Sequence, residues 1–373
     1  MPDFLYIHIP FCVRKCIYCD FLSVAYDESA AAKYITSLCK ELAVRKDSAG
    51  RLKTVYIGGG TPSLLSGDSF RQLFHCLREN FRLSDDAEIT VEANPGTIDG
   101  PKMHVLLSLG VNRLSIGVQS FNDAELKSLG RIHTSEEAVR ALELIKGAGL
   151  TNYSIDLMYG IPGQTMETWK ETLSQAIRLT PCHISAYELT PEKKTPLFGL
   201  LESGKMRLPG EDPVLEMYNY AIDHLFAAGY EHYEISNFSM PGFRSIHNLN
   251  YWNRGEYLGA GAGAHSFAAG IRSRNMEDVA RYCAAADRGI IPSAENVPVT
   301  PAEAARELIF LGLRKISGIS KVEAEALGLN IGAAASLLQE GYLEEDHESL
   351  RLTRKGLPLS NAVIVRLFEL LGL

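Results

Sequence analysis

Several features are absent from this chain, and each absence excludes a class of protein. No apolar run is long enough to cross a bilayer, so we expect no membrane span. Residues 1–10 lack the basic region and the cleavage site of a secretory signal peptide. Basic residues are not in excess: the net charge is −8, which argues against a dedicated nucleic-acid binder. We therefore expect a cytoplasmic protein that has no nucleic-acid partner.

Two familiar cofactor motifs are missing as well. A C-x-x-C-H motif ending at Cys182-His183 would need a cysteine where the chain has Leu179, so covalent attachment of a c-type heme is not supported. The run 259–264 alternates glycine and alanine, but it lacks the G-x-G-x-x-G order of a dinucleotide site. We interpret that run as a turn or a point of tight packing.

The elements that are present alternate regularly through the first half of the chain. The 373 residues, of which 46% are hydrophobic and 22% charged, suffice for a large barrel and a smaller domain. Six β-rich runs alternate with helical patterns, which predicts an α/β fold: a partial (β/α)6 TIM-like barrel with parallel strands. The predicted strands are 4–9, 54–57, 88–92, 113–117, 153–158 and 183–187. The predicted helices are 28–46, 68–80, 100–109, 135–148 and 167–179.

This alternation ends after Tyr187. A polar, proline-containing connection is followed by a predicted helix at 214–228 and an irregular, aromatic stretch at 230–257. The last part indicates a winged-helix-like α+β module, with helices at 301–313, 321–327, 332–340 and 361–370 and short strands at 343–345 and 350–352. Its negative charge favours a protein-facing or structural role over DNA binding. We divide the chain into a barrel (1–235), a connecting segment (236–299) and a C-terminal domain (300–373).

The most informative motif is a C-x3-C-x2-C loop just after the first predicted strand. Cys12, Cys16 and Cys19 place three thiols in one short loop, whereas a closed structural zinc site needs four ligands. A [4Fe–4S] cluster has four irons, so three cysteines leave one iron open to an exchangeable ligand. The alternative is a set of buried thiols or a zinc site that a residue such as His8 completes.

Glycine and polar residues also lie at the ends of the later predicted strands, within them or just after them. These residues are the run Gly58–Pro62, Glu92, Gln119 and Asp156. Functional groups of βα barrels gather at the C-terminal ends of the strands, so we predict a site at one mouth of the barrel. The glycine run alone fits a tight turn equally well, and a single polar residue of this kind is commonly structural.

Together these motifs resemble those of the radical S-adenosylmethionine (SAM) superfamily, in which SAM chelates the open iron through its amino and carboxylate groups. Within it, the chain is similar to the subgroup of oxygen-independent coproporphyrinogen III oxidase and the HemW-type heme chaperones. The similarity covers nearly the whole chain and includes YIHIPFC from Tyr6, GGGTP from Gly58, GVQSF from Gly117 and GRIH from Gly130. It implies SAM contacts at Tyr6, Tyr18, Gly59, Gly60, Thr61, Glu92, Gln119, Arg131 and Asp156.

The chemistry of SAM explains these residue types. A glycine run lets the backbone approach and hydrogen-bond the amino group. Glu92 and Asp156 can accept hydrogen bonds from hydroxyl or amino groups, and Arg131 can pair with the carboxylate through its planar guanidinium. Tyr18 can lie against the adenine, and Tyr6 can pack near the cluster.

Two features separate the chain from the oxidase pattern. The oxidase has a further cysteine two residues after the last cluster ligand, where this chain has Phe21. The oxidase also has a long N-terminal arm, whereas this chain reaches Cys12 almost at once. Both features match the heme-chaperone branch, for which porphyrinogen decarboxylation is not expected.

A third feature is the stretch from His247 to Trp252, which fits the HNxxYW motif of heme-binding members. His247 can supply an axial imidazole ligand to heme iron, and Tyr251 and Trp252 can flank the macrocycle. Taken alone, such a stretch would more often be structural packing, and the family resemblance reverses that preference. His265 is a rival iron ligand.

The sequence therefore predicts a heme chaperone that binds a [4Fe–4S] cluster, SAM and heme and transfers heme to an acceptor protein. One alternative is a true coproporphyrinogen III oxidase, in which a reduced cluster cleaves SAM. Another is a zinc-stabilised binding protein without radical chemistry. The acceptor is unidentified, and a homodimer and a peripheral contact with a membrane-bound acceptor stay open.

Overall fold

A computed structural model describes all 373 residues, and its centre is a nine-stranded sheet in the order β11-β1-β4-β5-β6-β7-β8-β10-β9. Neighbouring strands from β11 to β8 pair in parallel, whereas β10 and β9 are antiparallel additions at the far edge. The predicted α/β partial barrel is confirmed. Its strands are β1 (Phe4–Ile9), β4 (Leu52–Gly59), β5 (Leu83–Ala93), β6 (Arg113–Gln119), β7 (Tyr153–Tyr159) and β8 (His183–Glu188), with β9 (Glu231–Glu234), β10 (Asn237–Ser239) and β11 (Leu258–Ala260) at the edges.

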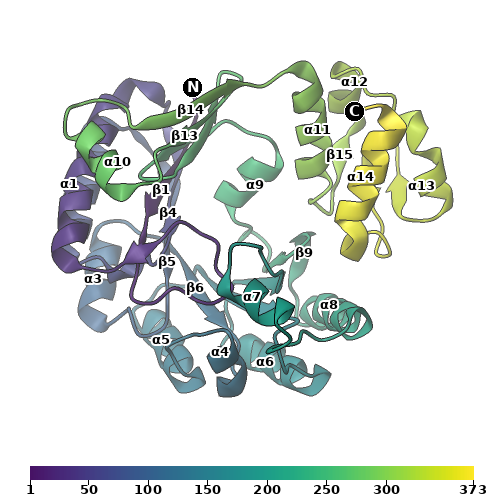
Figure 1. Cartoon of the computed structure of the whole chain (residues 1–373), viewed down its shortest axis with the longest axis horizontal. Helices are drawn as coiled ribbons and strands as arrows, with labels where there is room; N and C mark the ends of the chain where they lie inside the picture. The colour runs from purple at the N-terminus through teal and green to yellow at the C-terminus, as the bar shows by residue number, and fades with distance from the viewer.

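Helices cover the outside of this sheet, as successive βα units require. Figure 1 shows them in an arc around the strands. They are α1 (Glu28–Val44), α2 (Gly67–Asn80), α3 (Gly100–Ser108), α5 (Ser135–Gly147), α6 (Met166–Arg178) and α8 (Glu211–Ala227). The start of α5 is a capping box, in which Thr134 and Glu137 satisfy each other's backbone N–H groups. Two short helices, α4 (Asp123–Ser128) and α7 (Pro196–Glu202), were not predicted.

The connecting segment completes the sheet. The boundary predicted after residue 235 falls between β9 and β10, which pair with each other, and β11 pairs with β1. That boundary therefore divides one sheet. A second sheet of β12 (His265–Ala268), β13 (Ile271–Asn275) and β14 (Ser293–Pro298) lies beside α1, together with α10 (Val279–Ala286). The buried carboxylate of Glu41 ties this part to α1, because it accepts hydrogen bonds from the Tyr282 hydroxyl and the Gly261 N–H.

The short helix α9 (Ile246–Trp252) carries the HNxxYW stretch. It contacts β4 of the barrel on one side and α11 of the C-terminal module on the other. Figure 1 shows α9 between these two parts of the molecule. The motif therefore lies at a junction between the barrel and the module.

The C-terminal module combines four helices with a small antiparallel sheet in the order β15-β17-β16, as expected for a winged-helix-like module. Its elements are α11 (Pro301–Gly312), β15 (Ile319–Ser320), α12 (Lys321–Ala326), α13 (Ala335–Gln339), β16 (Leu343–Glu345), β17 (Ser349–Leu352) and α14 (Ser360–Leu371). The helix predicted at 332–340 begins as a 3-10 turn over Ile331–Ala334. No helix in the whole chain has the length and apolarity that crossing a membrane requires.

Candidate cofactor site

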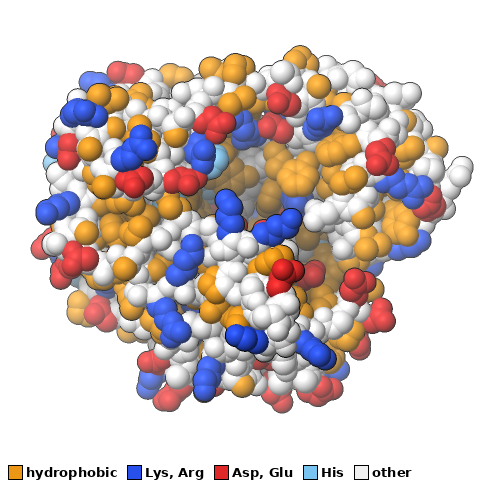
Figure 2. Space-filling model, in the orientation of Figure 1, with side chains coloured by type: hydrophobic (Ala, Val, Ile, Leu, Met, Phe, Trp, Pro, Cys, Tyr) orange, Lys and Arg blue, Asp and Glu red, His pale blue; other side chains and the backbone are white.

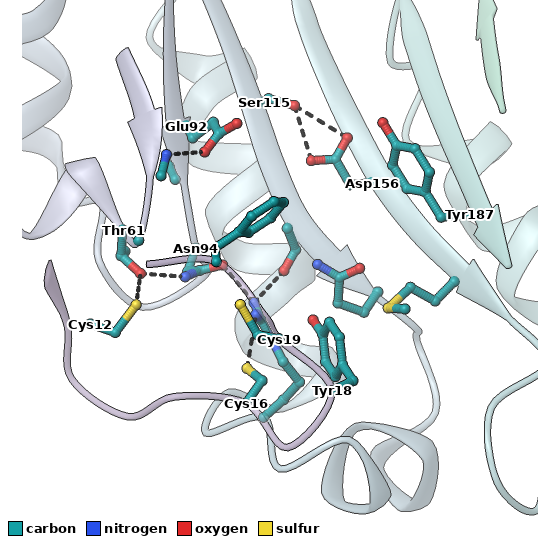
Figure 3. A pocket seen from close by; sticks show the side chains of 18 of the residues that line it. Cys12, Cys16, Tyr18, Cys19, Thr61, Glu92, Asn94, Ser115, Asp156 and Tyr187 are labelled. Carbon is teal, nitrogen blue, oxygen red and sulfur yellow. Dashed lines mark hydrogen bonds between the residues drawn. The ribbon is translucent and has the colours of Figure 1, made fainter. Parts of the chain in front are cut away.

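The cysteine loop leaves the sheet directly after β1 and is closed at its base. Short strands β2 (Phe11–Cys12) and β3 (Val24–Ala25) pair there, and the N–H of Tyr26 donates to the carbonyl of Cys12 at 2.9 Å. All three cysteines of the loop are free thiols and are partly buried. They line a cavity of about 440 Å³ that extends over the ends of the strands. Figure 3 shows the sulfurs of Cys16 and Cys19 close to each other near Tyr18, and the sulfur of Cys12 beside Thr61.

Each thiol has a different environment. The Cys12 Sγ lies 3.7 Å from the Thr61 hydroxyl, and the Cys16 Sγ accepts from Arg131 Nη1 at 3.6 Å. Burial raises the pKa of Cys19. No three ligand side chains converge closely enough to hold a single metal ion. A cluster does not require such convergence, because each thiolate binds its own iron.

The zinc alternative needed a fourth ligand such as His8, and this imidazole is already engaged. Its Nδ1 lies 3.0 Å from the Tyr6 hydroxyl, and its Nε2 lies 3.0 Å from the Leu22 carbonyl oxygen. Burial also lowers the pKa of His8. The ring therefore packs beneath the loop and is held away from the role of a zinc ligand.

The glycine run at the end of β4 is required by close backbone contacts. A Cβ on Gly60 would lie 2.6 Å from the carbonyl oxygen of Phe11, and one on Gly59 would lie 2.6 Å from the His8 ring. Gly59 also has a φ of 119°, which favours glycine. Its N–H donates to Glu92 at 3.0 Å, so the turn helps to position a carboxylate in the cavity.

Two partly buried carboxyl groups face the cavity from β5 and β7, the strands on either side of β6 (Figure 3). Glu92 accepts from the Tyr56 hydroxyl at 2.7 Å, and burial raises its pKa to about 7. Asp156 accepts from Ser115 at 3.0 Å and from Ser185 at 2.8 Å, and burial raises its pKa as well. Both groups can accept further hydrogen bonds from a ligand.

Arg131 is held beside the cysteine loop by neutral acceptors. Its Nη2 donates to the Asn94 side chain at 2.6 Å and to the Gly117 carbonyl at 2.5 Å. Its Nε is buried without a hydrogen-bond partner. Gln119 lines the same cavity and has a φ of 70°, an unusual conformation for a residue other than glycine.

The cavity thus brings together most of the residues implied by the sequence. They are Cys12, Cys16, Tyr18, Cys19, Gly59, Gly60, Thr61, Glu92, Gln119, Arg131 and Asp156. Tyr6 and His247 do not line it. Arg14 and Lys15 do, and Figure 2 shows lysine and arginine side chains around a hollow near the centre of this face.

His247 is enclosed between β4 and α9. Its side chain is 1% exposed, its Nδ1 lies 2.6 Å from the Thr54 hydroxyl, and its Nε2 lies 2.8 Å from the Tyr251 hydroxyl. Its ring stacks on Tyr56 at a centroid distance of 5.1 Å. Burial lowers the pKa of His247 to about 3, so the imidazole is neutral. The rival His265 is exposed on β12.

Comparison with known proteins places this geometry in a family. Residues 6–176 match the model of the radical SAM superfamily, and residues 299–359 match the HemN C-terminal domain. The heme chaperone HemW of Lactococcus lactis is 39% identical over 97% of this chain and 96% of its own length. The chain belongs to the HemW family of radical SAM proteins.

Two further relatives illustrate the range of the match. HemW of Escherichia coli is 47% identical to this HemW-family chain over 71% of the chain and 70% of the relative. The coproporphyrinogen III oxidase HemN of Escherichia coli has the same fold, with a TM-score of 0.84 over 98% of this chain and 90% of HemN at 24% identity. The likeness to HemN concerns the fold alone.

Membership of the radical SAM superfamily implies a [4Fe–4S] cluster and SAM as cofactors, and the residues of this HemW-family protein fit both. Three free thiols on one loop suit three irons of a cluster, one thiolate to each iron. The unpartnered Nε of Arg131 is a donor for an organic carboxylate. The Glu92 carboxylate and the tight glycine turn complete a polar cradle beside the loop.

The sequence reasoning missed several residues that line the HemW-family cavity, among them Asn94, Arg113 and Asn248. Asn94 comes directly after β5, so it could have been found from the tendency of functional residues to lie at the C-terminal ends of barrel strands. Arg113 opens β6 and lies deeper in the barrel, where that tendency does not apply. Asn248 lies on α9, far from the loop in sequence.

Proposed function

We propose that the protein is a heme chaperone, which binds a [4Fe–4S] cluster, SAM and heme and passes heme to an acceptor protein. The observation that carries the proposal is the match over nearly the full chain to proteins named heme chaperone HemW. The HNxxYW helix and the three-thiol loop, which has Phe21 and no fourth thiol, support it. We place this activity in the cytoplasm.

When bound, the cluster and SAM supply redox chemistry beside the cavity. The residues of the chain have separate parts in holding them. The loop cysteines ligate three irons, Arg131 pairs with the SAM carboxylate, and Glu92 accepts from a SAM amino or hydroxyl group. Asp156 accepts from the remaining polar groups deeper in the barrel. Tyr18, which lies between two of the ligands in sequence, packs against the adenine.

We propose His247 as the leading axial ligand of heme and His265 as its rival. Ligation by His247 requires that its Nε2 leave the Tyr251 hydroxyl, because both ring nitrogens are engaged. Opening one such hydrogen bond costs about 0.5–1.5 kcal/mol, and α9 must also move away from β4, because the His247 side chain is 1% exposed. His265 needs no such opening because its side chain is exposed.

The acceptor would meet the protein at the surface around heme. No spanning helix is present, so contact with a membrane-bound acceptor would be peripheral. We also predict a homodimer, which a measurement of the mass of the reconstituted protein in solution tests.

The deciding experiment is an anaerobic titration of cluster-replete protein with heme, followed by the Soret band with and without SAM. We expect saturable heme binding and no conversion of coproporphyrinogen III. Robust turnover of coproporphyrinogen would identify an oxidase instead, and zinc in place of iron and sulfide would identify the binding protein without radical chemistry.

The ligand assignment needs a control for packing. His247→Ala should shift or abolish the Soret band while cluster content and SAM binding stay normal. Thr54→Val removes the hydrogen bond at Nδ1 but keeps the imidazole, so it should retain the band. His265→Ala tests the rival, and wild-type heme affinity in the His247 variant would exclude His247 as the ligand.

A further inference from the structure

Arg113 is a buried arginine with no partner. It opens β6, is 2% exposed and lines the cavity from within the barrel. Its Nε has no hydrogen-bond partner, and its side chain forms no ion pair or hydrogen bond with the protein. A buried charge that lacks a partner is costly, and proteins retain one where something else pairs with it.

The two carboxylates near Arg113 are already occupied. Glu88 accepts from the backbone N–H groups of Ile246 and His247, each at 3.2 Å, and so holds the start of α9. Asp156 accepts from serine hydroxyls on three strands. Both carboxylates support the charge of Arg113 from a distance, but neither takes up its planar set of N–H donors.

A second polar group without a side-chain partner faces the same space. Asn248 lines the cavity, and its side-chain amide has no hydrogen-bond partner, whereas its backbone N–H donates to the Ser245 hydroxyl. On the strand beside Arg113, the Thr90 hydroxyl is also buried without a partner, and the two residues are register partners of β5 and β6. The HNxxYW stretch is therefore divided: His247 braces α9 against the barrel, and Asn248 faces the cavity.

We propose that Arg113 and Asn248 form a carboxylate-binding subsite at the inner end of the cavity. The guanidinium offers two parallel N–H donors to a carboxylate, and the amide offers a third. This subsite is distinct from Arg131, which lies beside the cysteine loop. The inference rests on the proposed function for its ligand: heme carries two propionate groups, and one of them enters this subsite. The other source of the same chemistry is a small free carboxylic acid.

The first test compares heme with heme dimethyl ester, in which both propionates are neutral. Wild-type, cluster-replete protein should bind the ester about ten- to a hundredfold more weakly than heme, as the loss of a charge-assisted pair predicts. Arg113→Met should bind heme as weakly as the wild type binds the ester, and the ester should bind equally to both proteins. Asn248→Ala should show a smaller loss in the same direction.

Controls separate the subsite from a general defect. Cluster content, SAM affinity and thermal midpoint are measured for each variant, and Arg113→Lys keeps the charge but not the paired donors. If Arg113→Met does not fold, the comparison of heme with its ester on wild-type protein and on Asn248→Ala decides the matter. A loss of SAM affinity without a change in heme affinity would overturn the assignment in favour of a role in SAM binding.

The second test uses propionate alone, with thermal denaturation as the readout. In one outcome, propionate raises the thermal midpoint of the wild type but not that of Arg113→Lys, while heme and its ester bind equally well. That combination of results assigns the subsite to a small free carboxylate. If the wild type binds no heme at all, the proposed function fails, and the propionate arm alone decides the subsite. Equal binding of heme and ester together with no response to propionate overturns the subsite and leaves the proposed function intact.

Discussion

Replacing Tyr56 with phenylalanine should weaken SAM binding and shift its pH dependence while the fold is kept. The Tyr56 hydroxyl donates to Glu92 Oε1 at 2.7 Å, and its ring stacks on His247. Phenylalanine keeps the ring and removes only the donor. Burial raises the pKa of Glu92 to about 7, and the hydrogen bond from Tyr56 opposes that rise.

The size of the effect follows from the hydrogen bond. A bond to a charged group contributes about 1.5–3 kcal/mol, and one pKa unit corresponds to about 1.36 kcal/mol, so the pKa of Glu92 should rise by roughly one to two further units. An ionised carboxylate is the better acceptor for a SAM amino or hydroxyl group. Wild-type affinity should therefore increase as the pH rises through about 7. A carboxyl that is half ionised at that pH becomes about one-tenth ionised when its pKa rises by one unit, so the variant should bind SAM about fivefold more weakly there.

Calorimetric titration of cluster-replete protein with SAM measures the affinity and its pH dependence. The titrations run between pH 5.5 and 8.5, roughly the range over which a carboxyl with such a pKa titrates. Tyr159→Phe is the matched control, because Tyr159 is buried on β7 but does not line the cavity. If Tyr56→Phe and the wild type had the same affinity and the same pH profile, Glu92 would not be the titrating SAM contact.

Three further predictions concern the cluster, the glycine turn and a buried acid. Serine at any one of the three loop cysteines should abolish the absorbance and iron content of a [4Fe–4S] cluster, whereas Cys39→Ser on α1 should preserve both. Gly60→Ala should lower the thermal midpoint and SAM affinity, since its Cβ would lie 2.6 Å from a backbone oxygen, whereas Gly147→Ala in α5 meets no atom within 4 Å and should stabilise by about 0.5–1 kcal/mol. Burial raises the pKa of Glu234 from its ordinary value of 4.5 to about 7. Ionised Glu234 therefore destabilises the folded protein increasingly as the pH rises from 4.5 towards 7. Glu234→Gln should therefore raise the thermal midpoint at pH 8 (about one unit above that pKa) and change it little near pH 4.5.

The repeating part of the fold could be predicted because its signals are local. Each βα unit has its own hydrophobic pattern, and this pattern marked Glu92, near the end of β5, and Asp156, within β7, as unusual polar residues of strands. The pairing of β11 with β1, which lie far apart in the sequence, could not be predicted in this way, because a strand of only three residues, Leu258–Ala260, carries no pattern of its own. The predicted boundary at residue 235 falls between β9 and β10, which pair with each other and are likewise only four and three residues long.

The site was predicted where residues share a loop or a strand end, and it was incomplete where tertiary packing decides. Arg113 looks like an ordinary charged residue at the start of a strand, and only the barrel turns it inward. The sequence also cannot tell that two adjacent residues, His247 and Asn248, face different surroundings: one is enclosed by Thr54 and Tyr251, and the other lines the cavity.

The pairing of β11 with β1 has a consequence for synthesis of the protein. Leu5 and Leu258 are register partners, so the first strand to leave the ribosome waits for its neighbour until most of the chain has been translated. During that interval one edge of β1 presents unpaired N–H and C=O groups, which are templates for association with other chains. Premature termination anywhere before residue 258 would leave that edge open permanently, so truncated products should aggregate even when every βα unit of the barrel has been made.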